Sequence, residues 1–120
     1  MENKKALKLI EKILVDLQNS GINTDTLITD LQELRGYALQ AQIPLAVKVL
    51  RLTYEHLEEN ENFLIPIPDD DPIEEGDEIV KEETFDPVES LSYLISLYKD
   101  LKNKMNLMDL SDYRNALLAF

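Results

Sequence analysis

The chain of 120 residues contains no cysteine. No disulfide, thiolate nucleophile or cysteine-bound zinc site can therefore form. The absence of thiols fits a reducing compartment, and we expect a cytoplasmic protein. Long apolar runs are also missing. The chain begins Met-Glu-Asn-Lys-Lys and enters an amphipathic pattern, so it predicts neither a signal peptide nor a membrane span, and we expect no membrane partner.

Glycine is scarce, with only three residues in the whole chain. Gly21, Gly36 and Gly76 are too far apart to form a glycine-rich phosphate loop. Ser90 and its neighbouring serines lack the Gly-x-Ser-x-Gly turn that exposes a nucleophile. These absences argue against phosphate-loop and serine-hydrolase chemistry.

Histidine occurs once, at position 56. One histidine can form neither a His-Glu-x-x-His zinc motif nor, without a nearby nucleophile, a catalytic triad. Thr53 stands where the diiron-bundle signature requires glutamate. We therefore predict that the protein is not an enzyme, that it has no catalytic or metal-ligating residues and no cofactor, and that His56 is a surface or half-buried structural residue.

Basic residues are outnumbered two to one, which leaves a net charge of −12. Most of the excess is local, because residues 61–86 contain eleven acids and one base, Lys81. Such a segment repels nucleic acid and anionic membranes and attracts basic surfaces or cations. We expect no nucleic-acid partner, since the basic footprint of such proteins is missing.

The remaining sequence is dominated by helical periodicity, with apolar residues recurring at steps of three and four. We predict an all-α fold, a single compact bundle of about five helices forming one domain, with an αα-hairpin over 23–60 at its centre. The wide apolar arcs of the second, third and fourth helices suggest that these three share the middle. The predicted helices span about 3–19, 24–41, 44–60, 87–104 and 107–118.

Several residues mark helix ends. Gly21 is placed to end the first helix in a left-handed conformation, and Asn23 is a candidate N-cap for the second. Pro44 suits the first turn of the third helix. Asp86, followed by Pro87, suits the start of the fourth, with Glu89 three residues after the cap as in a capping box.

Residues 61–86 interrupt the helical pattern and predict a long acidic, partly extended loop. Two prolines in Phe63-Leu64-Ile65-Pro66-Ile67-Pro68 exclude a central strand. We expect Phe63, Ile65 and Ile67 to pack against the helices. A loop of this length is usually functional or disordered.

The acids of this loop are the first candidate partner-binding residues: Asp69, Asp70, Asp71, Glu74, Glu75, Asp77 and Glu78. The loop also leaves open a divalent-cation site, because its spacing resembles part of an EF-hand. With Gly76 at the glycine position, Asp71, Glu75 and Glu82 fall at the first, fifth and twelfth positions. Ile73 at the third position departs from that pattern.

Two further candidates lie on helical faces. Tyr93 and Leu97 share a flank of the predicted fourth helix and would form a partner surface if its apolar arc were exposed. Glu55, Glu58 and Glu59 crowd the end of the third helix, where the macrodipole favours cations. They are read either as a solvated helix end or as an acidic cluster that serves a basic partner or an intramolecular lysine.

The leading hypothesis for function is a small acidic protein–protein interaction module of the adaptor, chaperone or inhibitor kind. Its partner would be another protein with a basic or apolar surface, and a homodimer is a further option. The alternatives are a nucleic-acid mimic that occupies a basic protein, and a divalent-cation-binding protein that uses the acidic loop.

Overall fold

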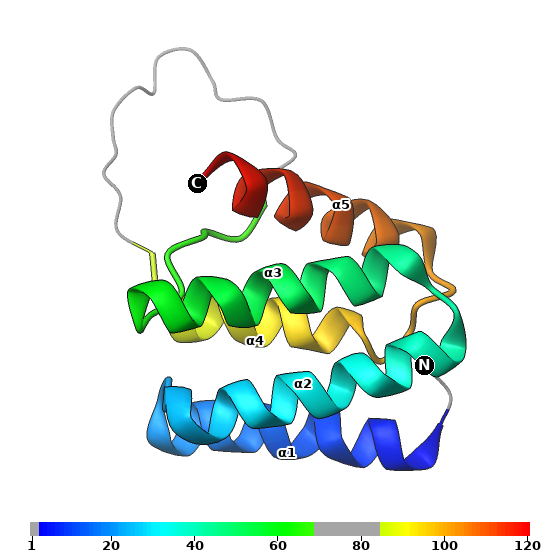
Figure 1. Ribbon diagram of the computed structural model, residues 1–120, viewed down its shortest axis with the longest axis horizontal. Helices are drawn as coiled ribbons and strands as arrows, with labels where there is room; N and C mark the ends of the chain where they lie inside the picture. Colours follow the sequence, from blue (N-terminus) through cyan, green and yellow to red (C-terminus); the bar gives the residue numbers. More distant parts are fainter. Residues whose placement is uncertain (1–2, 69–84) are drawn as a thin grey trace.

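The structure is a computed structural model that describes residues 3–68 and 85–120, and these form a single compact all-α bundle of five helices. The predicted fold class is confirmed. The elements, labelled in Figure 1, are α1 (Lys4–Ser20), α2 (Thr24–Ala41), α3 (Pro44–Asn60), α4 (Pro87–Leu97) and α5 (Lys104–Ala119).

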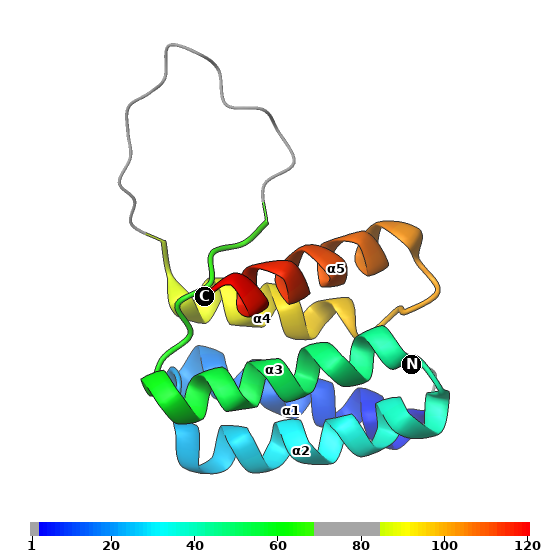
Figure 2. The same ribbon diagram turned by 45° about the horizontal axis from the view of Figure 1, so that its top comes forward.

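The helices form a ring in the order α1, α2, α3, α5, α4, and α4 returns to α1. Figures 1 and 2 show α1 and α2 along one side, α3 and α4 next, and α5 across the top. The hairpin α2–α3 is one side of this ring, and no helix is enclosed by the others, contrary to the arrangement with three central helices. The reason is that every helix carries exposed polar residues, so each must keep one face in water.

The core lies inside the ring and receives apolar side chains from all five helices. Its largest fully buried residues are aromatic: Tyr98, Tyr113 and Phe63. The Tyr98 hydroxyl donates to the carbonyl oxygen of Ala46 at 2.9 Å, which joins the segment after α4 to α3 across the core. A buried tyrosine needs such a partner for its hydroxyl. Complete burial raises the pKa of Tyr98 well above its ordinary value.

The predicted caps of α2, α3 and α4 are confirmed. Asn23 accepts a hydrogen bond from the Asp25 N–H at 3.2 Å, and Asp86 accepts one from the Val88 N–H at 2.9 Å. Pro44 lies in the first turn of α3. These side chains replace helical partners that the first N–H groups lack.

Positive φ angles occur at the ends of three helices. Gly21 ends α1 with φ 71° and ψ −156°, a region open essentially to glycine alone, rather than the left-handed helical conformation expected. Gln42 ends α2 and Glu61 ends α3 in the left-handed conformation, which costs a non-glycine residue about 1–2 kcal/mol.

The predicted fourth helix was too long, since α4 ends at Leu97 rather than near residue 104, and α5 begins at Lys104 rather than 107. Two polar side chains reverse the chain between them. Asp100 accepts from the Lys102 N–H at 3.1 Å, and Asn103 caps α5 by accepting from the Met105 N–H at 2.8 Å. Short polar side chains of this kind compete with helical hydrogen bonds.

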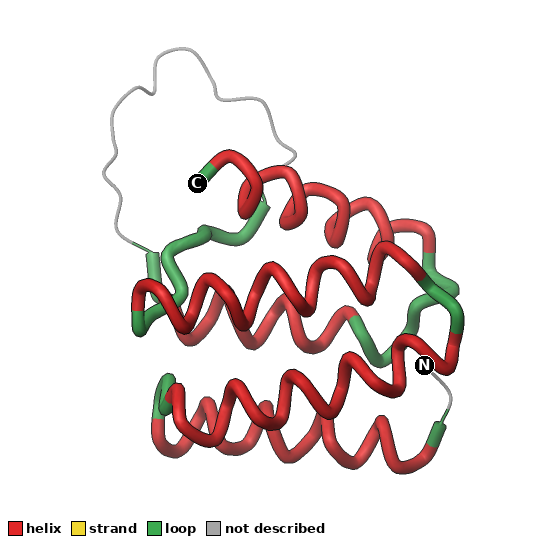
Figure 3. Tube along the Cα trace, in the orientation of Figure 1, coloured by secondary structure: helices red, strands yellow, loops and turns green. Residues whose placement is uncertain are grey.

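The described part of the acidic loop begins as an extended segment, as expected, and Figure 3 shows it as loop after α3. Phe63 is fully buried and Ile65 is nearly so, which confirms their predicted packing, while Ile67 is half-buried. No strand occurs within residues 3–68 and 85–120. In the same residues, none of the helices combines the length and apolarity needed to cross a membrane.

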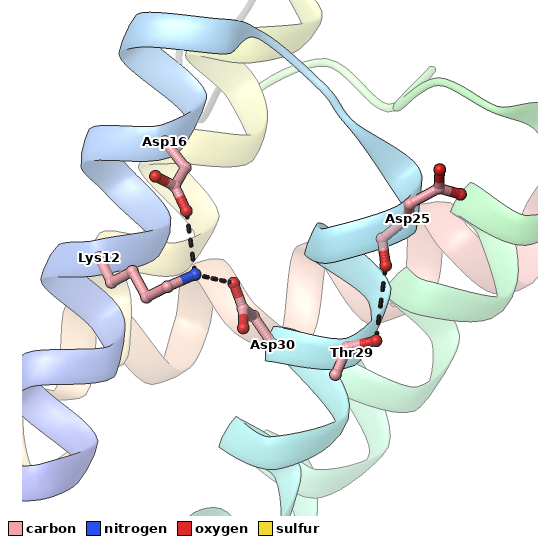
Figure 4. Close-up of polar contacts among 5 residues, drawn as sticks. All are labelled: Lys12, Asp16, Asp25, Thr29 and Asp30. Atoms are coloured by element: carbon pink, nitrogen blue, oxygen red, sulfur yellow. Dashed lines mark hydrogen bonds and ion pairs between the residues drawn. The ribbon is translucent and has the colours of Figure 1, made fainter.

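Ion pairs on the surface tie neighbouring helices together. The Lys12 ammonium group lies 2.7 Å from Asp30 of α2 and 3.1 Å from Asp16 of its own helix (Figure 4). Hydrogen bonds from Asp30 and then Asp16 raise the pKa of Lys12. Because half of the Lys12 side chain is exposed, solvent screening limits the stabilisation to about 0–1 kcal/mol.

Candidate functional site

The seven loop acids predicted from the sequence, Asp69 to Glu78, lie outside the described residues. The EF-hand-like positions Asp71, Glu75 and Glu82 lie there as well. Neither prediction is therefore placed in the fold. Within residues 3–68 and 85–120, no group of three or more histidine or acidic side chains is arranged to hold a metal ion.

Tyr93 and Leu97 do not form an exposed patch. Leu97 is 3% exposed and belongs to the core, which corrects its expected place on a surface. Tyr93 is half-buried, and its hydroxyl donates to the Asp109 carboxylate of α5. Because α4 packs against both α1 and α5, this flank of the helix is used inside the bundle.

An acidic groove of about 340 Å³ lies instead between the second half of α3 and the end of α5. Its walls carry carboxylates and its floor is apolar. The lining residues are Leu52, Glu55, His56, Glu58, Glu59, Leu117 and Phe120. Phe120 is 64% exposed, so a large apolar ring lies open beside the glutamates. The groove can hold a segment that combines cationic and apolar groups.

The charge of the acidic groove is only partly balanced from within. Arg51 pairs with Glu55 at 3.3 Å along α3. The ion pairs among the described residues include neither Glu58 nor Glu59, so the intramolecular lysine considered for this cluster is not found there. Both carboxylates also lie at the negative end of the α3 macrodipole, where each costs about 0.3–1 kcal/mol.

His56 joins the floor of the acidic groove to the core. Its exposed fraction is 6%, lower than the surface or half-buried position expected from the sequence. Its Nε2 atom accepts a hydrogen bond from the Leu64 N–H at 3.1 Å, and its ring meets Phe63 and Phe120 edge-on. Burial lowers the pKa of His56, and the nearby Glu59 opposes this effect. The neutral ring thus holds the extended segment against α3.

Buried hydroxyl groups anchor the other side of the same segment. Ser90 donates to the carbonyl oxygen of Ile65 at 2.6 Å, and the Tyr113 hydroxyl donates to the carbonyl oxygen of Ser90 at 2.9 Å. Burial, together with the nearby Tyr93 and Asp109, raises the pKa of Tyr113, although its hydrogen bond with Ser90 lowers it in part. Ser90 is therefore occupied in joining α4, α5 and the extended segment.

A cationic groove of about 370 Å³ lies on the opposite side of α3, between its first half and α2. The groove contains three bases, no acid, and a mostly apolar floor. The lining residues are Arg35, Leu39, Gln42, Ile43, Pro44, Val47, Lys48 and Arg51. Leu39 is 52% exposed within it. The Arg35 Nε atom is buried without a hydrogen-bond partner. This groove is the counterpart of the acidic one in both charge and position.

The largest groove, of about 460 Å³, is at the end of the bundle where the start of α1, the end of α2 and the α4–α5 connection meet. Lys99 and Lys102 line it, but so does Asp100. Lys99 is already engaged with Glu11 at 2.6 Å. Its charges are mixed and partly satisfied, so it fits a specific ligand less well than the two grooves beside α3.

Comparison with known proteins adds no family: no family model, characterised protein or solved structure matches this chain. The functional argument therefore rests on the residues of the chain itself. Sequence reasoning identified the three glutamates of the acidic groove but not Leu117 and Phe120, which join them only through the packing of α5. It also missed Lys48 and Arg51, although their position one to two turns before Glu55 was a readable signal.

Proposed function

We propose that this protein is a protein–protein interaction module, without catalytic activity, that binds a basic segment of another protein in the acidic groove. The observation that carries the proposal is the placement of Glu55, Glu58 and Glu59 around an apolar floor. A partner segment with lysine or arginine on one side and apolar residues on the other would meet both features.

Electrostatics supports a binding role more than a stabilising one. Glu58 and Glu59 have no cation paired to them among the described residues and oppose the macrodipole of α3. A cationic partner would relieve this unfavourable placement, and the negative field would raise its association rate. Burial of Phe120 and Leu117 against the partner would then supply the apolar contribution to affinity.

A pull-down from cell lysate, read by mass spectrometry at low and high salt, tests the proposal. The bait is the full chain, compared with the variant Glu55→Gln, Glu58→Gln, Glu59→Gln. The matched control neutralises three exposed acids elsewhere, Asp25→Asn, Glu33→Gln and Asp112→Asn. We expect a basic partner that binds the wild type and the control, is lost from the groove variant, and weakens at high salt.

A fourth bait carries amides in place of the seven acids between residues 69 and 78. A partner lost only from this bait would move the binding site to that segment and contradict the groove. Capture of no partner by the wild type, or equal capture by the groove variant, would contradict the proposal as a whole.

A further inference from the structure

The outer face of α3 carries charges in an order that helix stability does not explain. Its five charged residues are Lys48, Arg51, Glu55, Glu58 and Glu59. At 100° per residue, all five fall within an arc of about 100° on the helix. Both bases precede all three acids along this single stripe, which we call the α3 stripe.

Two general effects act against this order. The macrodipole of a helix favours acids in its first turns and bases in its last, whereas the α3 stripe has the reverse. The ion pair in the stripe, Arg51 with Glu55, places the base before the acid, which is the weaker of the two orientations at this spacing. Both partners are also largely exposed, at 42% and 49%. The order therefore needs an explanation outside the isolated chain.

The surroundings of the α3 stripe repeat its polarity. The cationic groove lies beside its basic half, toward α2, and the acidic groove lies beside its acidic half, toward α5. Each groove offers an exposed apolar residue, Leu39 in the first and Phe120 in the second. Leu52 is half-buried near the middle of the stripe. The surface is thus positive at one end, negative at the other and apolar along both grooves.

We propose that the occupant of this surface is a second copy of the same chain, with its α3 antiparallel to the first. A two-fold axis near Leu52 places Lys48 opposite Glu58 or Glu59 of the other copy and Arg51 opposite its Glu55. Every contact then occurs twice, as an isologous dimer requires. A foreign basic segment would satisfy only the acidic half, and a foreign acidic segment only the cationic half. A second copy satisfies both halves, because it brings the same charges in reversed order.

This inference goes beyond the proposed function and does not depend on it. The two share Glu55, Glu58 and Glu59, so a basic partner and a second copy would compete for the acidic groove. Self-association of the pure protein is measured with no partner present. Its failure would therefore leave the proposed function standing, and the loss of the proposed function would leave the dimer standing.

Analytical ultracentrifugation of the full chain over a wide concentration range tests the dimer. Ionic strength is kept near physiological, where the Debye length of about 8 Å screens the repulsion of distant charges more than contact pairs. The all-acidic variant is Lys48→Glu with Arg51→Glu, and the all-basic variant is Glu55→Lys, Glu58→Lys and Glu59→Lys. We expect the wild type to dimerise and each variant alone to lose at least tenfold in affinity for itself.

Mixing provides the decisive measurement. The all-acidic and all-basic variants, each monomeric alone, should form a heterodimer when combined, and a chain carrying all five reversals should dimerise again. The control Lys5→Glu with Lys8→Glu changes net charge as the all-acidic variant does, on exposed positions of α1, and should dimerise like the wild type. Circular dichroism verifies that each variant is folded.

Three outcomes would overturn the inference. The first is a wild type that stays monomeric at the highest concentration. The second is a folded variant that self-associates as the wild type does. The third is a mixture of the two variants that remains monomeric, because complementary charges on α3 would then not be what holds two copies together.

Discussion

The two grooves beside α3 have similar size and opposite charge, but they differ in what lies beneath them. The acidic groove is built over the core: His56 forms part of its floor and holds the Leu64 N–H, and Phe63 packs against the inner edge of that ring. The cationic groove is built over the turn between two helices, with half-buried or exposed residues in most of its lining. The contrast teaches that changes near the acidic groove act on both binding and folding, whereas changes in the cationic groove act mainly on binding.

Removing Phe63 should break the acidic side of this comparison most severely. Phe63→Ala deletes a fully buried ring, and we expect the free energy of unfolding to fall by about 3–5 kcal/mol. Leu39→Ala in the cationic groove, where the side chain is 52% exposed, should change it by at most about 0.5 kcal/mol. Urea denaturation followed by circular dichroism measures both values. Equal losses in the two variants would show that the grooves do not differ in their support.

Removing His56 should have a smaller effect on the same side. His56→Ala leaves the Leu64 N–H without its acceptor, and we expect a loss of about 1–3 kcal/mol at neutral pH. The pKa of His56 is lowered in the folded protein, so the unfolded chain binds its proton more readily. The contribution of this group to stability is therefore complete above the ordinary histidine pKa of about 6.5 and is lost as pH falls toward the lowered value.

Urea midpoints measured in steps from neutral pH downward check this dependence. His56→Gln is the control, because it removes the only histidine while keeping a polar side chain of similar reach. The wild type should lose stability across the window and the glutamine variant should change less. Parallel curves for the two proteins would show that the titration of His56 is not linked to folding.

The smallest expected effect is a gain at the two left-handed helix ends, one on each side of the comparison. Gln42 borders the cationic groove with φ 61°, and Glu61 follows the acidic end of α3 with φ 57°. Gln42→Gly and Glu61→Gly should each raise the free energy of unfolding by up to about 1 kcal/mol, because glycine adopts this conformation without steric cost.

Thermal and urea unfolding of these glycine variants provide the measurement. Gln40→Gly, an exposed position inside α2, is the matched control and should lose about 1 kcal/mol. A gain at only one of the two helix ends would show that side-chain contacts, rather than backbone conformation, govern the other.

Much of the fold was readable because it depends on local rules. The caps at Asn23 and Asp86 and the start of α3 at Pro44 follow from short-range hydrogen bonding and ring geometry. The end of α4 was not readable in this way, since Tyr98 and Leu101 continue the apolar pattern past the true helix end. Their burial in the core and the capping by Asn103 outweighed that pattern.

The candidate site was readable only in part, for the same reason. Glu55, Glu58 and Glu59 stood out in the sequence because they oppose the helix macrodipole. Leu97 was misplaced because the periodicity of a wide apolar arc does not say which of its sides a neighbouring helix covers. Phe120 reaches His56 across more than sixty positions of the chain, and no local pattern reports such a contact.

The sequence by itself determined the all-α class, most helix boundaries, the packing of Phe63 and Ile65, and the charges on α3. These properties follow from interactions between residues close together in the chain. Only the tertiary structure decided the ring order of the helices, the burial of His56 and Leu97, and the presence of two oppositely charged grooves on either side of α3. Those features depend on which helices become neighbours, and that is settled by the packing of the whole core at once.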